Sequence, residues 1–150
     1  IISYTWFVSG ADRARVRTGL SYFVPNYFHQ LPKLCRDYMA IDVVVTTVSP
    51  MDETGYFSFG TANDFISTAA RSAKRLIVEV NRQMPRVFGD SLLHISEVDA
   101  VVETDAPLFV LPQAPPEPED DLIGERIANL IPDGATIQIG TGGRGILSTG

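Results

Sequence analysis

Two runs of β-branched residues give the clearest signal in the hydrophobic pattern of the chain. The segments IDVVVTTV, at 41–48, and RLIVEVN, at 75–81, are apolar with few interruptions. A continuous apolar run of this length is typical of a strand that is buried on both faces, as in a parallel sheet. We therefore expect both segments to be central strands of such a sheet.

Shorter segments of the pattern predict the remaining elements. Short apolar runs predict strands at 1–8, 21–24, 56–60, 91–95, 99–104 and 136–140. Helical spacing predicts helices at 11–17, 26–38, 63–75 and 120–131. We expect Asn26 and Asn63 to cap the second and third helices, and Pro32 to break or kink the second. Strands that alternate with helices indicate an α/β fold with an open, mostly parallel sheet flanked by helices.

One proline-rich segment predicts a domain boundary. The stretch LPQAPPEPEDD, at 111–121, contains four prolines and four acidic residues, a composition typical of a stiff, solvated linker. The sequence thus predicts a first α/β domain at 1–111, a linker at 112–121 and the start of a second domain at 122–150. The chain begins inside a predicted strand and lacks an initiating Met, so we expect it to be a piece of a longer protein.

Composition and charge narrow the functional classes. The formal net charge is −6, which argues against a nucleic-acid partner. Cys35 is the only cysteine, so no internal disulfide can form, and we expect it to fill the core. No apolar run is long enough to span a membrane, and no signal peptide is recognisable. We therefore expect the protein to be cytoplasmic.

Two polar segments follow the two predicted central strands. Loops at the carboxyl ends of parallel strands are the usual ligand sites of α/β proteins, which makes 48–60 and 79–99 candidate site segments. By its pattern alone, the first segment favours a plain β-turn, in which Asp52 and Glu53 would be solvated. In the second, His94 lies between two apolar residues and is either a core histidine or a site residue. No second ligand lies at metal-binding spacing, so we expect no metal site.

A glycine-rich stretch near the end of the chain allows two interpretations. Gly140, Gly142 and Gly145 follow the strand-like segment TIQI with the spacing G-x-G-x-x-G, which is the fingerprint of a dinucleotide-binding turn. That function also requires a longer helix and an acidic residue on the next strand. Alternatively, the turn directs its backbone N–H groups at another anionic group.

Taken in order, these segments resemble the acetyl-CoA hydrolase/transferase family, which includes 4-hydroxybutyrate and butyrate:acetate CoA-transferases. The resemblance rests on VSPMDETGYFSFG, EVNRQMPRVFGDSLLHISEVDAVVE, the proline-rich acidic linker and IGERIANLIPDGATIQIGTG. It covers about residues 41–142, and residues 1–40 match more loosely. After the glycine turn, residues 144–150 depart from the family pattern, which has a Pro and a longer helix there.

The resemblance implies a CoA-transferase-like fold with two similar α/β domains. It implies CoA transfer from a small acyl-CoA thioester to a carboxylate through a glutamyl-CoA thioester, or hydrolysis of the acyl-CoA. Coenzyme A is then a substrate component, without a metal, and a homo-oligomer is an open expectation. The family's nucleophilic glutamate would lie beyond residue 150, so we expect no catalytic residue in this segment.

The resemblance also suggests which residues line the site. By position, Gly140, Thr141 and Gly142 would contact the thioester or its oxyanion, and the dinucleotide fingerprint would be coincidental. Candidate acyl-group contacts are Ser58, Phe59, Gly60 and His94.

Overall fold

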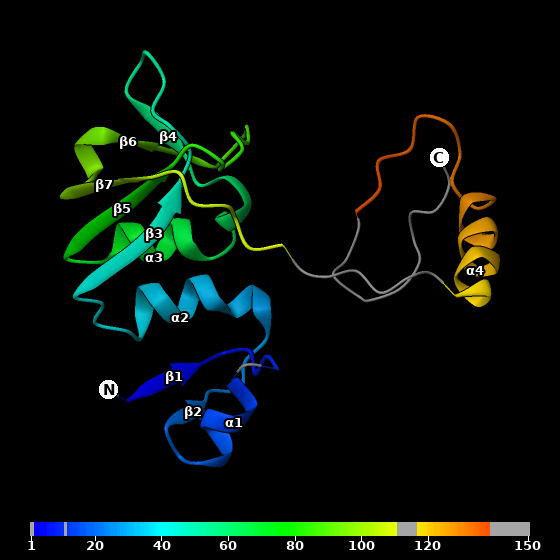
Figure 1. Ribbon diagram of the computed structural model, residues 1–150, viewed down its shortest axis with the longest axis horizontal. Coiled ribbons are helices and arrows are strands. Elements are labelled where there is room, and N and C mark those ends of the chain that lie inside the picture. The colour runs from blue at the N-terminus through cyan, green and yellow to red at the C-terminus, as the bar shows by residue number, and fades with distance from the viewer. Residues whose placement is uncertain (1, 11, 111–116, 139–150) are drawn as a thin grey trace. The chain divides into compact units, whose positions relative to one another are not determined.

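The computed structural model describes residues 2–10, 12–110 and 117–138, and the chain divides into two compact units (Figure 1). The first unit is Ile1–Leu108 and the second is Phe109–Gly150. The first unit contains all the strands of the described residues.

A three-stranded parallel sheet forms the centre of the first unit. Its order is β3 (Val43–Val48), β5 (Arg75–Asn81) and β7 (Ala100–Thr104). In register, Val48 lies opposite Val80, and Val80 lies opposite Glu103. The carboxyl ends of all three strands therefore meet at one edge of the sheet. The predicted parallel α/β architecture is confirmed.

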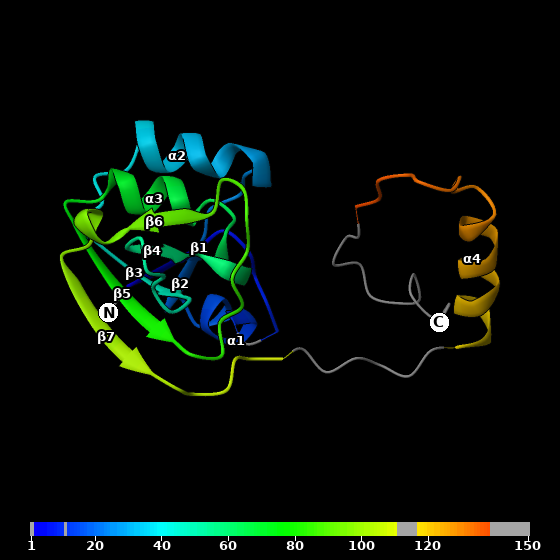
Figure 2. The same ribbon diagram turned by 90° about the horizontal axis from the view of Figure 1, so that it is seen from above.

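Helices cover one face of this sheet. Both α2 (Leu31–Asp37) and α3 (Ile66–Ser72) lie on the same side of β5 and β7 in Figure 2. The core between the layers joins the two helices to the sheet and to two further strands. It comprises Cys35, Val44, Val48, Phe57, Phe59, Ala69, Ala70, Leu76, Val78 and Leu93. Cys35 is fully buried there, as expected, and this burial raises the pKa of its thiol.

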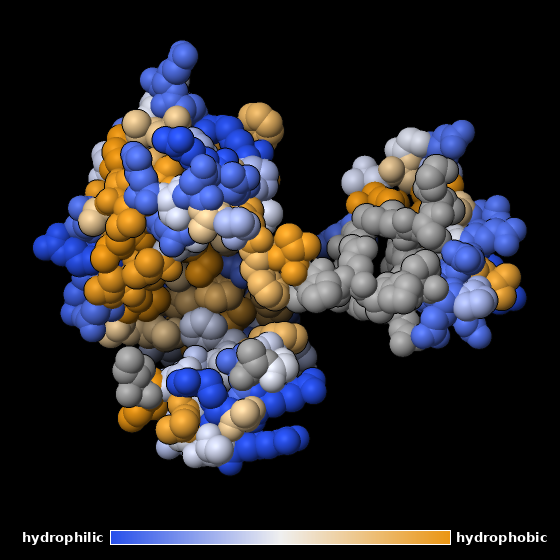
Figure 3. All heavy atoms as spheres, viewed as in Figure 1, coloured by the Kyte–Doolittle hydropathy of each residue, from blue (hydrophilic) through white to orange (hydrophobic). Residues whose placement is uncertain are grey.

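Among the described residues, nothing covers the opposite face of the sheet, contrary to the expectation that both faces would be covered. Side chains of β3 alternate between buried and exposed, and Val43 and Val45 are 50% and 66% exposed. Figure 3 shows hydrophobic side chains gathered on the visible face of the first unit, where Figure 1 places β3 in front of α3. The β-branched run correctly predicted a parallel strand but not which of its faces other segments cover.

Two small sheets complete the first unit. A parallel pair joins β1 (Ser3–Thr5) to β2 (Ser21–Phe23), with α1 (Asp12–Arg17) between them in sequence. An antiparallel pair joins β4 (Tyr56–Ser58) to β6 (Leu92–His94). Short 3-10 helices lie at η1 (Phe28–Gln30), η2 (Gly60–Ala62) and η3 (Ile95–Glu97).

The predicted caps of two helices are wrong. Asn26 does not cap a helix, because its side-chain amide donates to the carbonyl oxygen of Val24 (2.8 Å). Pro32 lies in the first turn of α2 and begins that helix, since the first turn does not need its missing N–H. Asn63 donates to the carbonyl oxygen of Asp90 (3.2 Å) and does not cap α3.

The second unit contains α4 (Pro118–Ala128). The helix begins earlier than expected, because Pro118 is in its first turn and the backbone N–H of Glu117 donates to the Asp120 carboxylate (2.8 Å). Residues 118–121, predicted as linker, are thus helical. Residues 135–138 do not form the predicted strand, and 139–150 lie outside the described residues.

Candidate functional site

Hydrogen bonds join the loop parts of the two candidate segments, 49–60 after β3 and 82–94 after β5, and we call these parts the interlocked loops. Within the first loop, the backbone N–H of Ser49 donates to the carbonyl oxygen of Ser58 (2.8 Å). Between the loops, the N–H of Phe59 donates to the carbonyl oxygen of Ser91 (2.8 Å). Segments about 30 residues apart in sequence are therefore held together as one layer next to the sheet edge.

Ser58 is the polar centre of the interlocked loops. Its hydroxyl donates to the carbonyl oxygen of Val87 (3.0 Å) and accepts from the N–H groups of Gly60 (3.1 Å) and Val87 (3.0 Å). The hydroxyl of Ser91 lies 3.3 Å away. Ser58 is completely buried, so its hydrogen-bonding capacity is used within the protein.

The neighbouring candidates, Phe59 and Gly60, are also buried. Phe59 is fully enclosed in the core. Gly60 has a φ of +56°, and a Cβ added there would lie 2.4 Å from the Met84 sulfur and 2.7 Å from the carbonyl oxygen of Pro85. Only glycine fits this conformation and spacing. In this structure, Ser58, Phe59 and Gly60 hold the interlocked loops together, and their proposed contact with an acyl group stays a prediction.

Asp52 is a structural anchor and not the solvated turn residue that the sequence suggested. Its carboxylate accepts from the backbone N–H groups of Tyr56 (2.9 Å) and Thr54 (2.9 Å) and from the Thr54 hydroxyl (2.7 Å). Arg86 of the second loop forms an ion pair with it. The hydrogen bonds from Tyr56 and Thr54, followed by the Arg86 charge, lower the pKa of the Asp52 carboxyl.

His94 lies at the end of β6, where it shapes a corner. Its Nδ1 atom lies 2.8 Å from the Ser96 hydroxyl, and its ring packs edge-on against Tyr56. The backbone N–H of His94 donates to the Glu97 carboxylate (3.1 Å). These contacts account for the partial burial of His94, and its predicted role in substrate binding stays a prediction.

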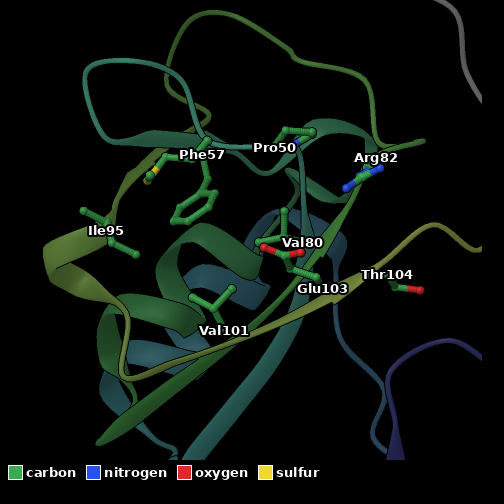
Figure 4. A pocket seen from close by; sticks show the side chains of 9 residues that line it. Pro50, Phe57, Val80, Arg82, Ile95, Val101, Glu103 and Thr104 are labelled. Carbon is green, nitrogen blue, oxygen red and sulfur yellow. The ribbon is translucent and has the colours of Figure 1, made fainter.

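A cavity of about 320 Å³ lies where the carboxyl ends of the central strands meet, and we call it the edge cavity (Figure 4). Its lining is mainly apolar, with three polar residues. The lining comprises Pro50, Met51, Phe57, Val80, Arg82, Ile95, Val101, Glu103 and Thr104. An apolar hollow with a few polar groups at this edge of a parallel sheet has the character of a ligand site.

Arg82 is held at the edge cavity by its backbone. Its N–H donates to the carbonyl oxygen of Thr104 (3.3 Å). On one side of it, the buried Asn81 donates to the carbonyl oxygen of Ala106 (2.9 Å) and accepts from the N–H of Gln83 (2.8 Å). The Arg82 side chain itself is exposed and has no hydrogen bond or ion pair within the described residues. A fixed backbone thus presents an unpaired guanidinium.

Sequence reasoning pointed to the sheet edge at which the edge cavity lies, but it did not select Arg82 or Glu103. Arg82 stood out only as one of several polar residues after β5, and Glu103 is part of a predicted strand. Arg82 and Glu103 come to the same cavity because Val80 pairs with Glu103 across β5 and β7. This strand pairing has no local sequence signal. The predicted thioester contacts Gly140, Thr141 and Gly142, and Gly145 of the dinucleotide fingerprint, lie outside the described residues.

The described residues contain no group of three or more His, Cys, Asp or Glu side chains arranged to hold a metal ion. None of their helices combines the length and the apolar character that crossing a bilayer requires.

The parallel sheet, its helices and the edge cavity define an α/β domain with a cavity at the carboxyl ends of its strands. Residues 3–112 match the model of the acetyl-CoA hydrolase/transferase N-terminal domain, and the chain belongs to this family.

Named relatives include the succinyl-CoA:cyclohexane-1-carboxylate CoA transferase of Geobacter metallireducens, which is 46% identical over 92% of this chain and 32% of its own length. The 4-hydroxybutyrate coenzyme A transferase of Clostridium kluyveri is 44% identical over 91% of this chain and 32% of its own length. The chain thus spans about a third of these relatives.

Solved structures agree with this assignment. RipA from Yersinia pestis superimposes with a TM-score of 0.86 and 48% identity, over 95% of this chain and 35% of RipA. A 4-hydroxybutyrate CoA-transferase from Porphyromonas gingivalis gives a TM-score of 0.69 and 33% identity, over 95% of this chain and 38% of that structure. The predicted CoA-transferase-like fold is confirmed.

Proposed function

We propose that the protein containing this chain moves CoA between a small acyl-CoA thioester and a carboxylate acceptor. The observation that carries the proposal is the similarity to relatives named as CoA transferases, which extends over more than nine tenths of this chain. The edge cavity supports it, because a mainly apolar hollow of this size suits a short acyl group.

The reaction would proceed through covalent catalysis by a glutamate beyond residue 150. An oxygen of its carboxylate attacks the thioester carbonyl carbon, CoA leaves as the thiolate, and a mixed anhydride forms. The thiolate then attacks the glutamyl carbonyl, which gives an enzyme–CoA thioester and frees the first carboxylate. The acceptor carboxylate repeats these steps in reverse. Division of one difficult exchange into easier steps is the benefit of a covalent nucleophile.

Backbone N–H groups would donate hydrogen bonds to the thioester oxygen from Gly140, Thr141 and Gly142. Negative charge develops on that oxygen at each addition step, and one aimed donor contributes on the order of 10²–10³ in rate. No histidine, metal or nucleotide cofactor is needed for this chemistry. The dinucleotide interpretation of Gly140, Gly142 and Gly145 has no comparable support from the relatives.

The test is a CoA-exchange assay on the full polypeptide. With butyryl-CoA and acetate, we expect acetyl-CoA and butyrate in equal amounts, and borohydride should inactivate the enzyme only after butyryl-CoA is added, because it reduces the enzyme–CoA thioester. Release of free CoA thiol at the same rate with and without acetate would instead show a hydrolase. Neither exchange nor thiol release from a folded protein would reject the proposal.

A further inference from the structure

Charge pairing around β5 singles out one side chain. The strand and the loop after it contain three arginines besides short apolar runs. Arg75 pairs with Asp99 (2.6 Å), and Arg86 pairs with Asp52. The guanidinium of Arg82, between them in sequence, has no acidic partner within the described residues, and its backbone N–H donates to the carbonyl oxygen of Thr104 (3.3 Å). A fixed but unpaired cation beside a cavity is suited to an anion.

The position of Arg82 relates this charge to the apolar lining. In the view of Figure 4, the Arg82 nitrogens lie to one side of the cavity, and Phe57, Ile95 and Val101 lie on the other. A ligand that fits both the Arg82 guanidinium and the apolar lining has an aliphatic body and one negatively charged end. A guanidinium binds a carboxylate through two parallel hydrogen bonds, which fixes the orientation of the ligand.

We propose that the edge cavity binds a small aliphatic monocarboxylate, with its hydrocarbon part against Val80, Ile95 and Val101 and its carboxylate on the Arg82 guanidinium. This binding site rests on the proposed function for its biological meaning. If the protein transfers CoA to a carboxylate, a free monocarboxylate is a co-substrate. Arg82 becomes the residue that selects and orients this co-substrate.

Glu103 adds discrimination against a second charge. It lies opposite Val80 in register, and Figure 4 shows its carboxylate beside Val80 in the cavity. It has no cationic partner within the described residues. A ligand with two carboxylates would bring a second negative charge into a cavity that already carries the Glu103 charge, which is unfavourable. Monocarboxylates such as butyrate should therefore bind more tightly than succinate.

The test is a titration of the full polypeptide with butyrate, followed through methyl signals of ¹³C-labelled Met, Ile and Val. We expect butyrate to shift the signals of Met51, Ile95 and Val101. Arg82→Gln should weaken butyrate binding by about tenfold to a hundredfold, the usual loss for a hydrogen-bonded charge. Arg82→Lys should bind butyrate more tightly than Arg82→Gln and less tightly than wild type, since it keeps the charge but loses the paired geometry.

Three controls separate charge from packing and folding. Arg13→Gln removes an exposed arginine of α1 that also has no partner within the described residues, and it should leave butyrate binding unchanged. Butan-1-ol has the same chain without the charge and should bind wild type and Arg82→Gln equally weakly. Glu103→Gln should improve succinate binding more than butyrate binding.

Shifts confined to other methyl groups, or equal butyrate affinity in wild type and Arg82→Gln, would overturn the inference. Both the variant and its control change exposed side chains, so the fold should persist, and unchanged methyl spectra before titration verify this. CoA exchange without butyrate binding at the edge cavity would leave the proposed function in place and reject only this site. Butyrate binding at the edge cavity without CoA exchange would leave this site in place and reject the proposed function.

Discussion

Two polar side chains inside the interlocked loops, Ser58 and Asp52, have many partners, whereas two at the edge cavity, Arg82 and Glu103, have none in the part of the chain that the structure describes. The buried Ser58 hydroxyl makes four contacts with three residues, and the Asp52 carboxylate has three hydrogen bonds and an ion pair. At the cavity, the Arg82 and Glu103 side chains have none within the described residues. The loops therefore serve as the support, and the cavity presents the groups that remain available for a ligand.

The largest expected effect is at Gly60, whose replacement would separate the two loops. Gly60→Ala forces a Cβ to within 2.7 Å of the Pro85 carbonyl oxygen in a backbone conformation with positive φ. We expect a loss of about 3 kcal/mol or more in the free energy of unfolding, measured by urea denaturation.

The matched control is Gly89→Ala. Gly89 also has a positive φ, +84°, but an added Cβ would meet no atom within 4 Å. Only the backbone strain remains, so we expect a loss of about 1 kcal/mol. Equal losses at the two positions would show that close packing at Gly60 is not what holds the loops.

A smaller loss is expected when the Ser58 hydroxyl is removed. Ser58→Ala leaves the buried N–H of Gly60 without its acceptor, which costs about 1–3 kcal/mol. Ser96→Ala, at an exposed hydroxyl, should change the unfolding free energy by no more than about 0.5 kcal/mol. A stable Ser58→Ala protein would indicate that this hydroxyl is available for another purpose, such as substrate contact.

The smallest effect concerns pH and Asp52. The folded state lowers the pKa of this carboxyl, so its contribution to stability is present above the unfolded pKa of about 3.9 and disappears as the pH falls through the lower folded value. We expect Asp52→Asn to lose less stability than wild type between about pH 5 and pH 3. Chemical denaturation at several pH values measures this difference.

Asp90→Asn is the control for the pH experiment. Asp90 lies in the second of the interlocked loops, is exposed, and its side chain has no hydrogen bond or ion pair within the described residues. Its acid profile should follow that of wild type. If Asp90→Asn and Asp52→Asn had the same profile, the Asp52 anchor would contribute nothing particular to holding the loops.

The predictable part of this structure is the part that depends on local sequence. The apolar runs at 41–48 and 75–81 predicted β3 and β5 because consecutive β-branched residues favour an extended, buried backbone. The polar segments after these strands pointed to the sheet edge at which the edge cavity lies.

The rest depends on tertiary contacts that no short segment encodes. The Ser58 hydroxyl meets Val87 and Ser91, about 30 residues away in sequence. Arg75 and Arg86 form ion pairs with aspartates brought to them by the fold, whereas the Arg82 side chain has no partner within the described residues. Pro32 illustrates the same limit on a smaller scale. A proline both breaks and begins helices, and the tertiary setting determined that it begins α2.

The most direct test of the contrast between the supporting loops and the edge cavity uses Ser58→Ala and Arg82→Gln. The unfolding free energy and the butyrate affinity are measured for both variants. Our account predicts that Ser58→Ala loses stability while its folded molecules keep their affinity, and that Arg82→Gln keeps stability but binds butyrate at least about tenfold more weakly. A folded Ser58→Ala protein that fails to bind butyrate, together with an Arg82→Gln protein that binds it normally, would contradict the account.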